Sequence, residues 1–242
     1  MKTISIPAFG GPEQLQLMDM AQPRPAEGEA LVKIDYAGIN FIDVYMRSGH
    51  YARSQTYQTP LPTTLGMEGA GTVAALGSGV ADLRIGDRVA WCIVRGSYAE
   101  YAAVPAWRLV KVPPEVPLNI ATALMLQGLT AHYLSHSAFA LGPGSSCLVH
   151  AAAGGVGQLL TQLAKLRGAL VIATVGSREK AEIASHRGAD HVVLYRDTDL
   201  FSYYTSDRLK VAVDREFPLA QAADAHRYLE GRNTKGKLLL GI

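Results

Sequence analysis

Residues 146–165 read SCLVHAAAGGVGQLLTQLAK, and this stretch predicts a strand, a glycine turn and a helix in direct succession. The run 147–151 has the length and bulk of a buried strand. Small residues fill positions 152–157, and apolar residues then recur at helical spacing until Gly168 predicts the end of the helix. The rest of the fold can be worked out from this unit.

The glycine turn carries the small residues that a dinucleotide phosphate site needs. They let backbone N–H groups approach a pyrophosphate, whose negative charge is favoured by the N-terminus of the following helix. Ala152 stands where the first glycine of the G-x-G-x-x-G pattern is expected. A tight turn that only packs the helix on the sheet is the alternative. We favour cofactor binding, because the strand that follows the helix also fits the pattern of a dinucleotide-binding unit.

The end of that next strand, residues 169–175, indicates which dinucleotide binds. It lies about twenty residues past the turn, where an acidic residue would hold the ribose of NAD. Residues 169–178 contain none, and Ser177, Arg178 and Lys180 offer a hydroxyl and two cations that suit a 2′-phosphate. The pattern predicts NADPH rather than NADH. The alternative is that both cations are solvated residues on the first turn of the next helix.

Composition limits the possible partners. The 242 residues are 48% hydrophobic and 18% charged, with a formal net charge of +2, which argues against nucleic acid or an anionic membrane as a partner. Residues 1–10 lack the apolar core of a signal peptide, and no apolar run approaches the roughly 20 residues of a membrane span. Cys92 and Cys147 lie in strand-like runs, so no disulfide framework is indicated. We therefore expect a cytoplasmic protein.

Residues 1–125 predict a compact β-domain. Strand-like runs at 30–36, 71–75 and 87–94 are separated by clusters of glycine and proline. Many short strands with regular turns are typical of a barrel. Residues 119–140 are rich in alanine and leucine and predict a helix that leads into the nucleotide-binding unit.

Six short motifs are distinctive in combination. They are NFIDVYMRSG at 40–49, GMEGAG at 66–71, GDRV at 86–89, GSYAE at 96–100, QGLTA at 127–131 and HAAAGGVG at 150–157. Together they resemble the quinone oxidoreductases, the zeta-crystallin-like branch of the medium-chain dehydrogenase/reductase superfamily. The resemblance runs from residue 1 to about 200 and resumes at about Leu209.

The resemblance implies an α/β protein with a GroES-like β-barrel catalytic domain and a Rossmann-type doubly wound domain. Residues 1–125 would form the first, with 215–242 returning to it, and 126–214 the second. In the cleft between them NADPH would pass a hydride to a quinone or another electron-poor carbonyl or alkene. Two alternatives are a non-catalytic NADPH-binding or structural relative and an enoyl or alkenal reductase. Relatives form homodimers.

Site residues also follow from the resemblance. On the substrate side it implies Asn40, Asp43, Tyr45 and Tyr51. Asn40 and Tyr45 can donate to an oxygen that gains charge as hydride arrives, and Asp43 would orient its neighbours. Packing at the rim of the cleft is the alternative for the tyrosines. On the cofactor side the resemblance implies Phe41, Thr130, Gly154, Gly155, Val156, Gly157, Gly176, Ser177, Lys180, Tyr195 and Arg232.

Residue types argue against a metal site. Zinc-dependent relatives hold a catalytic metal with Cys, His and Cys or Glu, and Asn40 and Met67 stand at the positions of the first Cys and the His. No Cys-x-x-Cys motif occurs, and His132 and His136 form a helical pair without a third ligand nearby. We expect no metal, so that hydrogen bonds must polarise the acceptor.

The family pattern breaks after the strand at 191–195. It would continue with Asp199-Leu200-Phe201, but too few residues lie between there and Leu209 for the second half of a doubly wound domain. We therefore expect an incomplete Rossmann domain, without the edge strand through which relatives dimerise. A shortened natural or spliced product, an engineered deletion and a sequence that omits residues of the molecule are all open explanations.

Overall fold

A computed structural model describes residues 1–196, 205–207, 210–232 and 234–241. The expected continuation at Asp199-Leu200-Phe201 lies outside these residues, as do Leu209 and Ile242. Within the described part, no helix is long and apolar enough to cross a membrane.

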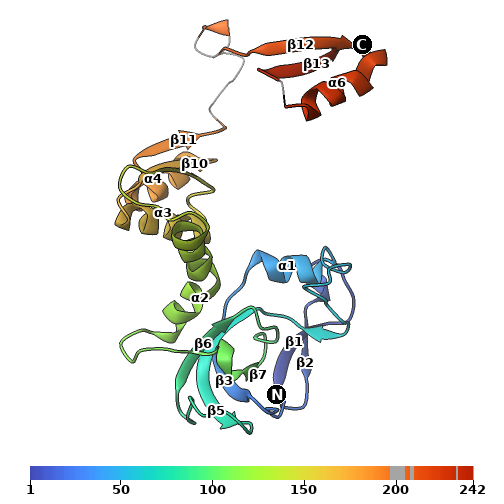
Figure 1. Cartoon of the computed structure of the whole chain (residues 1–242). Coiled ribbons are helices and arrows are strands. Elements are labelled where there is room, and N and C mark those ends of the chain that lie inside the picture. Colours follow the sequence, from blue (N-terminus) through green and yellow to red (C-terminus); the bar gives the residue numbers. More distant parts are fainter. Residues whose placement is uncertain (197–204, 208–209, 233, 242) are drawn as a thin grey trace.

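Two antiparallel sheets build the N-terminal part of the chain (Figure 1). The larger has the order β7-β3-β5-β6-β8, with β3 at Glu29–Ala37, β5 at Glu68–Leu76, β6 at Arg88–Cys92, β7 at Tyr101–Pro105 and β8 at Val110–Lys111. The smaller has the order β2-β1-β4, with β1 at Lys2–Ile6, β2 at Gln16–Asp19 and β4 at Thr63–Thr64. The strands expected at 30–36 and 71–75 lie within β3 and β5, and β6 begins and ends inside 87–94.

Alternating apolar residues of the larger sheet form the core of this part. Val32, Val73, Val89, Trp91 and Val104 are all fully buried, or nearly so, and pack in one cluster. Burying such side chains contributes about 1.5–3 kcal/mol each. Helix α1, Phe41–Arg47, follows β3 directly.

A close backbone approach holds β3 against β5. The two strands pair antiparallel, with Ile34 opposite Gly71. A Cβ atom on Gly71 would overlap the carbonyl oxygen of Lys33. Only glycine fits at this position without moving one strand.

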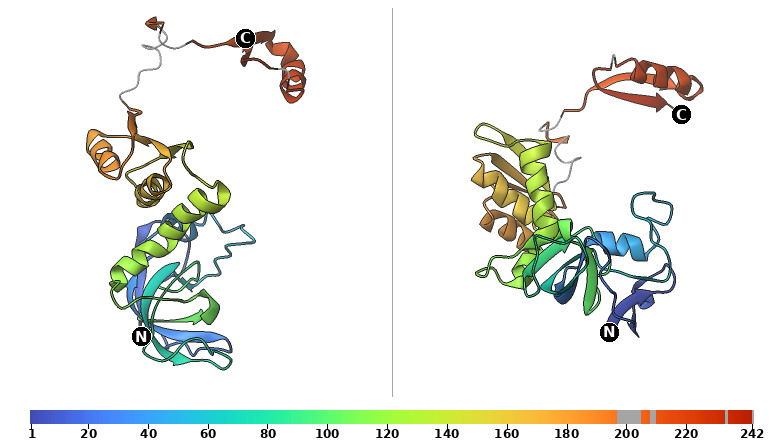
Figure 2. Two further views of the ribbon diagram at one scale, coloured as in Figure 1. Left: turned by 60° about the vertical axis from the view of Figure 1, so that its left-hand side comes forward. Right: turned by 60° about the horizontal axis from the view of Figure 1, so that its bottom comes forward.

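Helix α2, Leu118–His132, connects the β-domain to the rest of the chain. It packs against β5 and β6 at one end and against α3 at the other (Figures 1 and 2). A π-helical turn, Tyr133–Ala138, continues it, so the helix expected at 119–140 is interrupted near its end. The side chains of Thr122 and Thr130 donate to carbonyl oxygens four residues earlier in α2, at 2.8 and 2.7 Å.

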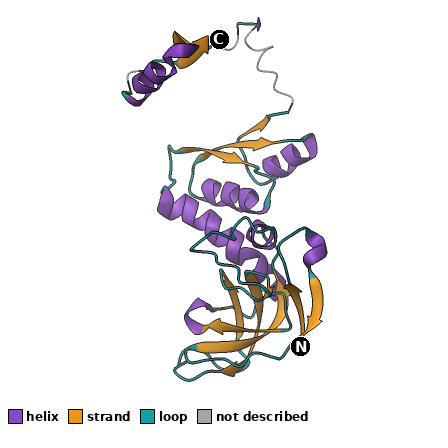
Figure 3. Cartoon of the chain, turned by 90° about the vertical axis from the view of Figure 1, so that its right-hand side faces the viewer, coloured by secondary structure: helices purple, strands orange, loops and turns teal. Residues whose placement is uncertain are grey.

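A three-stranded parallel sheet with the order β11-β10-β9 forms the second part. Its elements are β9 at Ser146–His150, α3 at Gly155–Leu166, β10 at Leu170–Val175, α4 at Arg178–His186 and β11 at His191–Leu194. The helices α3 and α4 lie side by side against the sheet (Figure 3). The core between them is built from small and β-branched residues such as Val149, Val171, Ala173, Ala164 and Ala184.

Among the described residues, β9 is an edge strand of this sheet. Leu148 in the middle of β9 is 55% exposed. A doubly wound sheet continues from its first strand into a second half. The described part of the sheet therefore corresponds to the first half alone.

The C-terminal residues form a small β-α-β unit that stands apart from the other elements in Figures 1 and 2. Strands β12, Val213–Pro218, and β13, Lys237–Gly241, pair parallel, and α6, Ala222–Glu230, connects them. A 3-10 turn, Leu219–Gln221, comes directly before α6. The return of 215–242 to the first domain and the other domain boundaries stay predictions.

Replacing Gly71 with alanine should destabilise the fold. We expect Gly71→Ala to lower the free energy of unfolding by about 3 kcal/mol, as overpacking against backbone does. Urea denaturation followed by tryptophan fluorescence measures the change. Gly142→Ala is the control, because a Cβ atom there has no neighbour within 4 Å. Equal stability of the two variants would contradict the steric argument.

Candidate active site

The glycine turn between β9 and α3 is shaped by one close backbone approach. Ala151 takes a left-handed conformation, with φ of 49°, and its carbonyl oxygen accepts from the Gly154 N–H at 2.8 Å. A Cβ atom on Gly157 would overlap Ala151 O and lie 2.7 Å from Ala152 Cα. Gly157 is therefore required for α3 to begin directly above the end of β9.

The N-terminus of α3 is open for an anion. Gly154 is its N-cap, in an extended conformation and without a side-chain cap. The first turn of a helix leaves N–H groups without partners inside the helix, and the helix dipole makes this end positive. Gly155 lies directly beneath the side chain of Gln127 from α2, because a Cβ atom on Gly155 would overlap Gln127 Oε1. Because the N–H groups of this first turn have no partners inside the helix and no side chain of the described residues caps it, the turn can hold a phosphate group close to the backbone.

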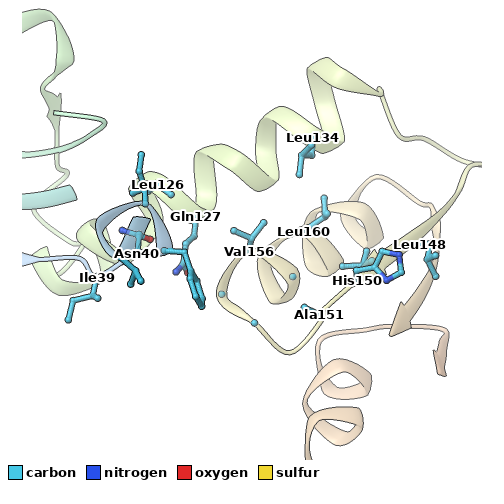
Figure 4. A pocket seen from close by; sticks show the side chains of 17 residues that line it. Ile39, Asn40, Leu126, Gln127, Leu134, Leu148, His150, Ala151, Val156 and Leu160 are labelled. Atoms are coloured by element: carbon cyan, nitrogen blue, oxygen red, sulfur yellow. The ribbon is translucent and has the colours of Figure 1, made fainter. Parts of the chain in front are cut away.

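A cavity of about 820 Å³ extends along this turn (Figure 4). Asn40 lies at one end beside Leu126 and Gln127 of α2, Val156 lies between the ends, and His150 and Leu148 lie at the other end. The cavity is lined by Ile39, Asn40, Phe41, Ile42, Val44, Leu126, Gln127, Leu134, Leu148, Val149, His150, Ala151, Gly154, Gly155, Val156, Gly157 and Leu160. It therefore joins Asn40, expected on the substrate side, and Phe41, expected on the cofactor side, to the expected phosphate turn.

A second pocket, of about 300 Å³, lies on the other side of the turn. It is lined by Ala151, Ala153, Gly154, Val175, Gly176, Lys180 and Tyr195. The Tyr195 hydroxyl closes over Gly176, where a Cβ atom would lie 2.6 Å from it. Because Ala151 and Gly154 line both cavities, the two adjoin at the glycine turn. Four expected cofactor residues, Gly154, Gly176, Lys180 and Tyr195, come together here.

Ser177 has a structural role that the sequence did not indicate. It is the N-cap of α4, and its side chain accepts from the Lys180 backbone N–H at 3.4 Å. It does not line the small pocket. The cap nevertheless holds the first turn of α4, and Lys180 in that turn lines the pocket. Ser177 therefore helps to position Lys180.

Asn40 in the cavity wall forms a buried polar cluster with Asp43 and Glu68, which do not line the cavity. Asn40 is 8% exposed, Asp43 3% and Glu68 2%. Asn40 Nδ2 donates to Glu68 Oε2 at 2.8 Å, and the Asn40 backbone N–H donates to Asp43 Oδ2 at 2.8 Å, as in a capping box. Asp43 therefore fixes the start of α1, and its role beside the substrate stays a prediction.

Burial raises the pKa of both carboxyls. Desolvation is the largest cause for Glu68, and hydrogen bonds from Leu126 N–H and Asn40 oppose it. Desolvation is also the largest cause for Asp43, opposed by contacts with Asn40 and Tyr98, while Glu68 adds repulsion. Asp43 Oδ1 is buried and has no hydrogen-bond partner among the described residues. Burial, followed by the charge of Asp43, likewise raises the pKa of the Tyr98 hydroxyl.

Aromatic side chains extend from the cavity wall along α1 and the loop after it. Phe41 and Tyr45 have ring centroids 6.0 Å apart, Tyr45 and Tyr51 meet edge to face at 5.7 Å, and Tyr51 stacks on Tyr57 at 5.3 Å. Phe41 is 74% exposed and contributes to the cavity wall. Tyr45 and Tyr51 lie behind it rather than in the wall itself.

Two expected cofactor residues lie elsewhere. Thr130 is on α2, one turn beyond Gln127, with its hydroxyl donated to Leu126 O. Arg232 is exposed in the turn after α6, within the C-terminal unit. The structure does not bring Arg232 to Lys180, and its contact with the cofactor stays a prediction.

Sequence reasoning missed the roles of Glu68, Gln127 and His150. Glu68 stands between Met67 and Gly69 in a buried strand, and a charged residue in such a run is itself a signal. His150 Nδ1 lies 2.9 Å from Thr174 Oγ1, which joins β9 to β10 at the cavity. Gln127 offers no local signal, because its contact is with a distant glycine.

The residues around Glu68 do not fit zinc. Zinc is bound by thiolates, imidazoles and carboxylates in sets of three or four. In the described part of the chain, no three His, Cys, Asp or Glu side chains come close enough to share an ion. Glu68 instead accepts hydrogen bonds from an amide and a backbone N–H.

Two protein families match the chain. Residues 26–114 match the family described as Alcohol dehydrogenase GroES-like domain, and residues 131–240 match the family described as Zinc-binding dehydrogenase. The solved structure of Escherichia coli quinone oxidoreductase complexed with NADPH is 36% identical, with a TM-score of 0.78, and the match covers 98% of this chain and 72% of that one. These matches confirm the predicted fold class.

Curated relatives include reductases with two kinds of name. The probable quinone oxidoreductase of Schizosaccharomyces pombe is 41% identical over 207 residues, which are 85% of this chain and 61% of the relative. The 2-haloacrylate reductase of a Burkholderia species is 36% identical over 193 residues, covering 78% and 57%. The chain spans about three fifths of the length of the curated relatives it matches.

The raised pKa of Asp43 predicts a pH dependence of stability. Above about pH 4 the unfolded chain loses this proton while the folded chain keeps it until its higher pKa is reached. The folded state then binds more protons, so the free energy of unfolding falls as pH rises through this window. Asp43→Asn should make this fall less steep in urea denaturation between pH 4 and 6. Equal slopes for both proteins would contradict it.

Proposed function

The chain belongs to the zinc-independent quinone oxidoreductase branch of the medium-chain dehydrogenase/reductase superfamily, and we propose that it reduces quinones or related electron-poor carbonyl compounds with NADPH. The observation that carries the proposal is the glycine turn, which borders both cavities at Ala151 and Gly154. One cavity contains Lys180 and the other contains Asn40. A dinucleotide laid across the turn would therefore reach a cation at one end and an amide donor at the other.

The residues of the turn fit the phosphates of NADPH. The backbone N–H groups of Gly155, Val156 and Gly157 would hold the pyrophosphate at the N-terminus of α3. Lys180 would bind the 2′-phosphate, and Tyr195 would cover the adenosine side of Gly176. Bound NADPH supplies the hydride. The proposal does not depend on Arg232.

The acceptor would lie at the Asn40 end of the large cavity. Phe41 offers an exposed ring against which a planar acceptor can pack. Asn40 lines this end and would donate a hydrogen bond to the oxygen that gains negative charge, and Tyr45, which contacts Phe41 outside the cavity wall, is proposed as a second donor. Asp43, buried behind Asn40, holds α1 in place, and Tyr51 supports the ring of Tyr45.

Two other functions stay as candidates for specific reasons. A protein that binds NADPH without reducing a substrate is favoured by the described sheet, which has three strands with β9 at its edge. Reduction of an electron-poor alkene is supported by the likeness to a 2-haloacrylate reductase. Oxidation of NADPH in the presence of an acceptor would exclude the protein that only binds NADPH. Comparing the rates with quinone and enone acceptors would distinguish a quinone reductase from an alkene reductase.

Domain organisation and assembly belong to the same proposal. Residues 1–125 with 215–242 would form the catalytic domain and 126–214 the NADPH-binding domain. A homodimer is expected from the family, although the strand through which relatives dimerise is expected to be missing, and a cytoplasmic location is expected from the sequence. Sedimentation of the purified chain tests the first of these two.

Lys180 provides the test of the cofactor. We expect the chain to bind NADPH more tightly than NADH in a fluorescence titration. Lys180→Ala should weaken NADPH about tenfold, as the loss of one charge-assisted contact does, and NADH by less than about twofold. Lys33→Ala, on β3, removes the same charge elsewhere and should change neither. Equal losses for both cofactors with Lys180→Ala would refute the 2′-phosphate assignment.

Tyr45 provides the test of the acceptor site. We expect Tyr45→Phe to lower kcat for reduction of 1,4-benzoquinone about tenfold, because one donor to the developing charge is lost. The dissociation constant of NADPH should stay the same. Tyr36→Phe, at an exposed position of β3, is the matched control. An unchanged kcat would show that Tyr45 only packs at the rim.

A further inference from the structure

Glu68 connects two walls of the large cavity through its two carboxylate oxygens. It is the first residue of β5. Its Oε2 accepts from Asn40 Nδ2 at 2.8 Å, and its Oε1 accepts from the Leu126 backbone N–H, in the middle of α2, at 2.6 Å. One side chain therefore joins the loop before α1 to the helix that leads to the glycine turn.

The contacts continue from α2 to the turn itself. Gln127, the residue after Leu126, lies with its side chain directly on Gly155. Both Gln127 and Gly155 line the large cavity, as does Asn40 (Figure 4). An unbroken series of contacts thus runs from Asn40 through Glu68 and α2 to the turn where the pyrophosphate is proposed to bind.

The position of the Glu68 carboxylate is fixed by its surroundings. A Cβ atom on Gly38 would overlap Glu68 Oε2, and the Gly38 N–H donates to the Glu68 carbonyl at 3.0 Å. Burial raises the pKa of this carboxyl, so keeping it there opposes stability. If this position of β5 served packing alone, an apolar residue would be more stable there than Glu68.

We propose that Glu68 is a positioning residue, which sets the place of the Asn40 amide relative to the glycine turn. The inference rests on the proposed function. Hydride transfer requires the reacting atoms to be about 3–3.5 Å apart, and a displacement of about 1 Å lowers the rate on the order of 100-fold. Because Glu68 holds Asn40 and α2 together, it controls this distance without touching either reactant.

The test is a double-mutant cycle on kcat for NADPH-dependent reduction of 1,4-benzoquinone. Glu68→Gln keeps the shape of the side chain but replaces one accepting oxygen with an NH2 group. That group would face either the Leu126 N–H or the Asn40 amide, and in the second case the Asn40 amide would have to flip. We expect kcat to fall about 10- to 100-fold, with KM for NADPH changed less than about threefold. In the Asn40→Ala background, Glu68→Gln should lower kcat no further, because Glu68 acts through Asn40.

The controls separate this role from a merely structural one. Glu29→Gln makes the same change at the start of β3, where Glu29 also accepts a backbone N–H, and should leave kcat unchanged. Additive losses in the cycle, or a loss confined to KM, would overturn the assignment. If Glu68→Gln does not fold, Gly38→Ala displaces the intact carboxylate, and the same cycle with Asn40→Ala decides. A wild-type chain that binds NADPH but reduces no quinone would overturn the proposed function as well.

Discussion

The close approach of α3 to the backbone at the end of β9 is the constraint on which the site depends. Gly157 must lack a side chain for the helix to start above Ala151, and Ala151 itself takes a left-handed conformation to make the turn. This geometry aims the first N–H groups of α3 outward and makes the turn a shared wall of two cavities. The proposed cofactor and acceptor ends meet at this turn, because both cavities border it.

A buried polar cluster in the β-domain is the second feature that shapes the site. Asn40 donates to both Asp43 and Glu68 in a buried region, through its backbone N–H and its side-chain amide. Interactions between polar groups strengthen in such surroundings, and an unmatched partner becomes expensive. The cluster therefore ties the start of α1 to β5, while Phe41 and Tyr45 on α1 are exposed.

Local elements could be predicted from sequence, and long-range relations could not. Helix α3 follows the glycine turn and ends just before Gly168, as predicted, because termination by a left-handed glycine is a local effect. The π-helical turn after α2 has no comparable pattern in sequence. Glu68 meets Asn40 and Leu126 across 28 and 58 residues, so its partners depend on packing. Arg232 was assigned by motif alone, and its place depends on how the C-terminal unit packs.

The continuity of α2 has a consequence for the lengths that related chains can have. Its 15 residues form a rod of about 22 Å, attached to the β-domain at one end and to α3 at the other. One inserted residue would rotate everything beyond it by about 100° and carry Gln127 away from Gly155. The loop at Gly142 and Gly144 has open space around it and can absorb such changes. Insertions and deletions should thus accumulate beside α2 and not within it, which makes its residue count part of the site.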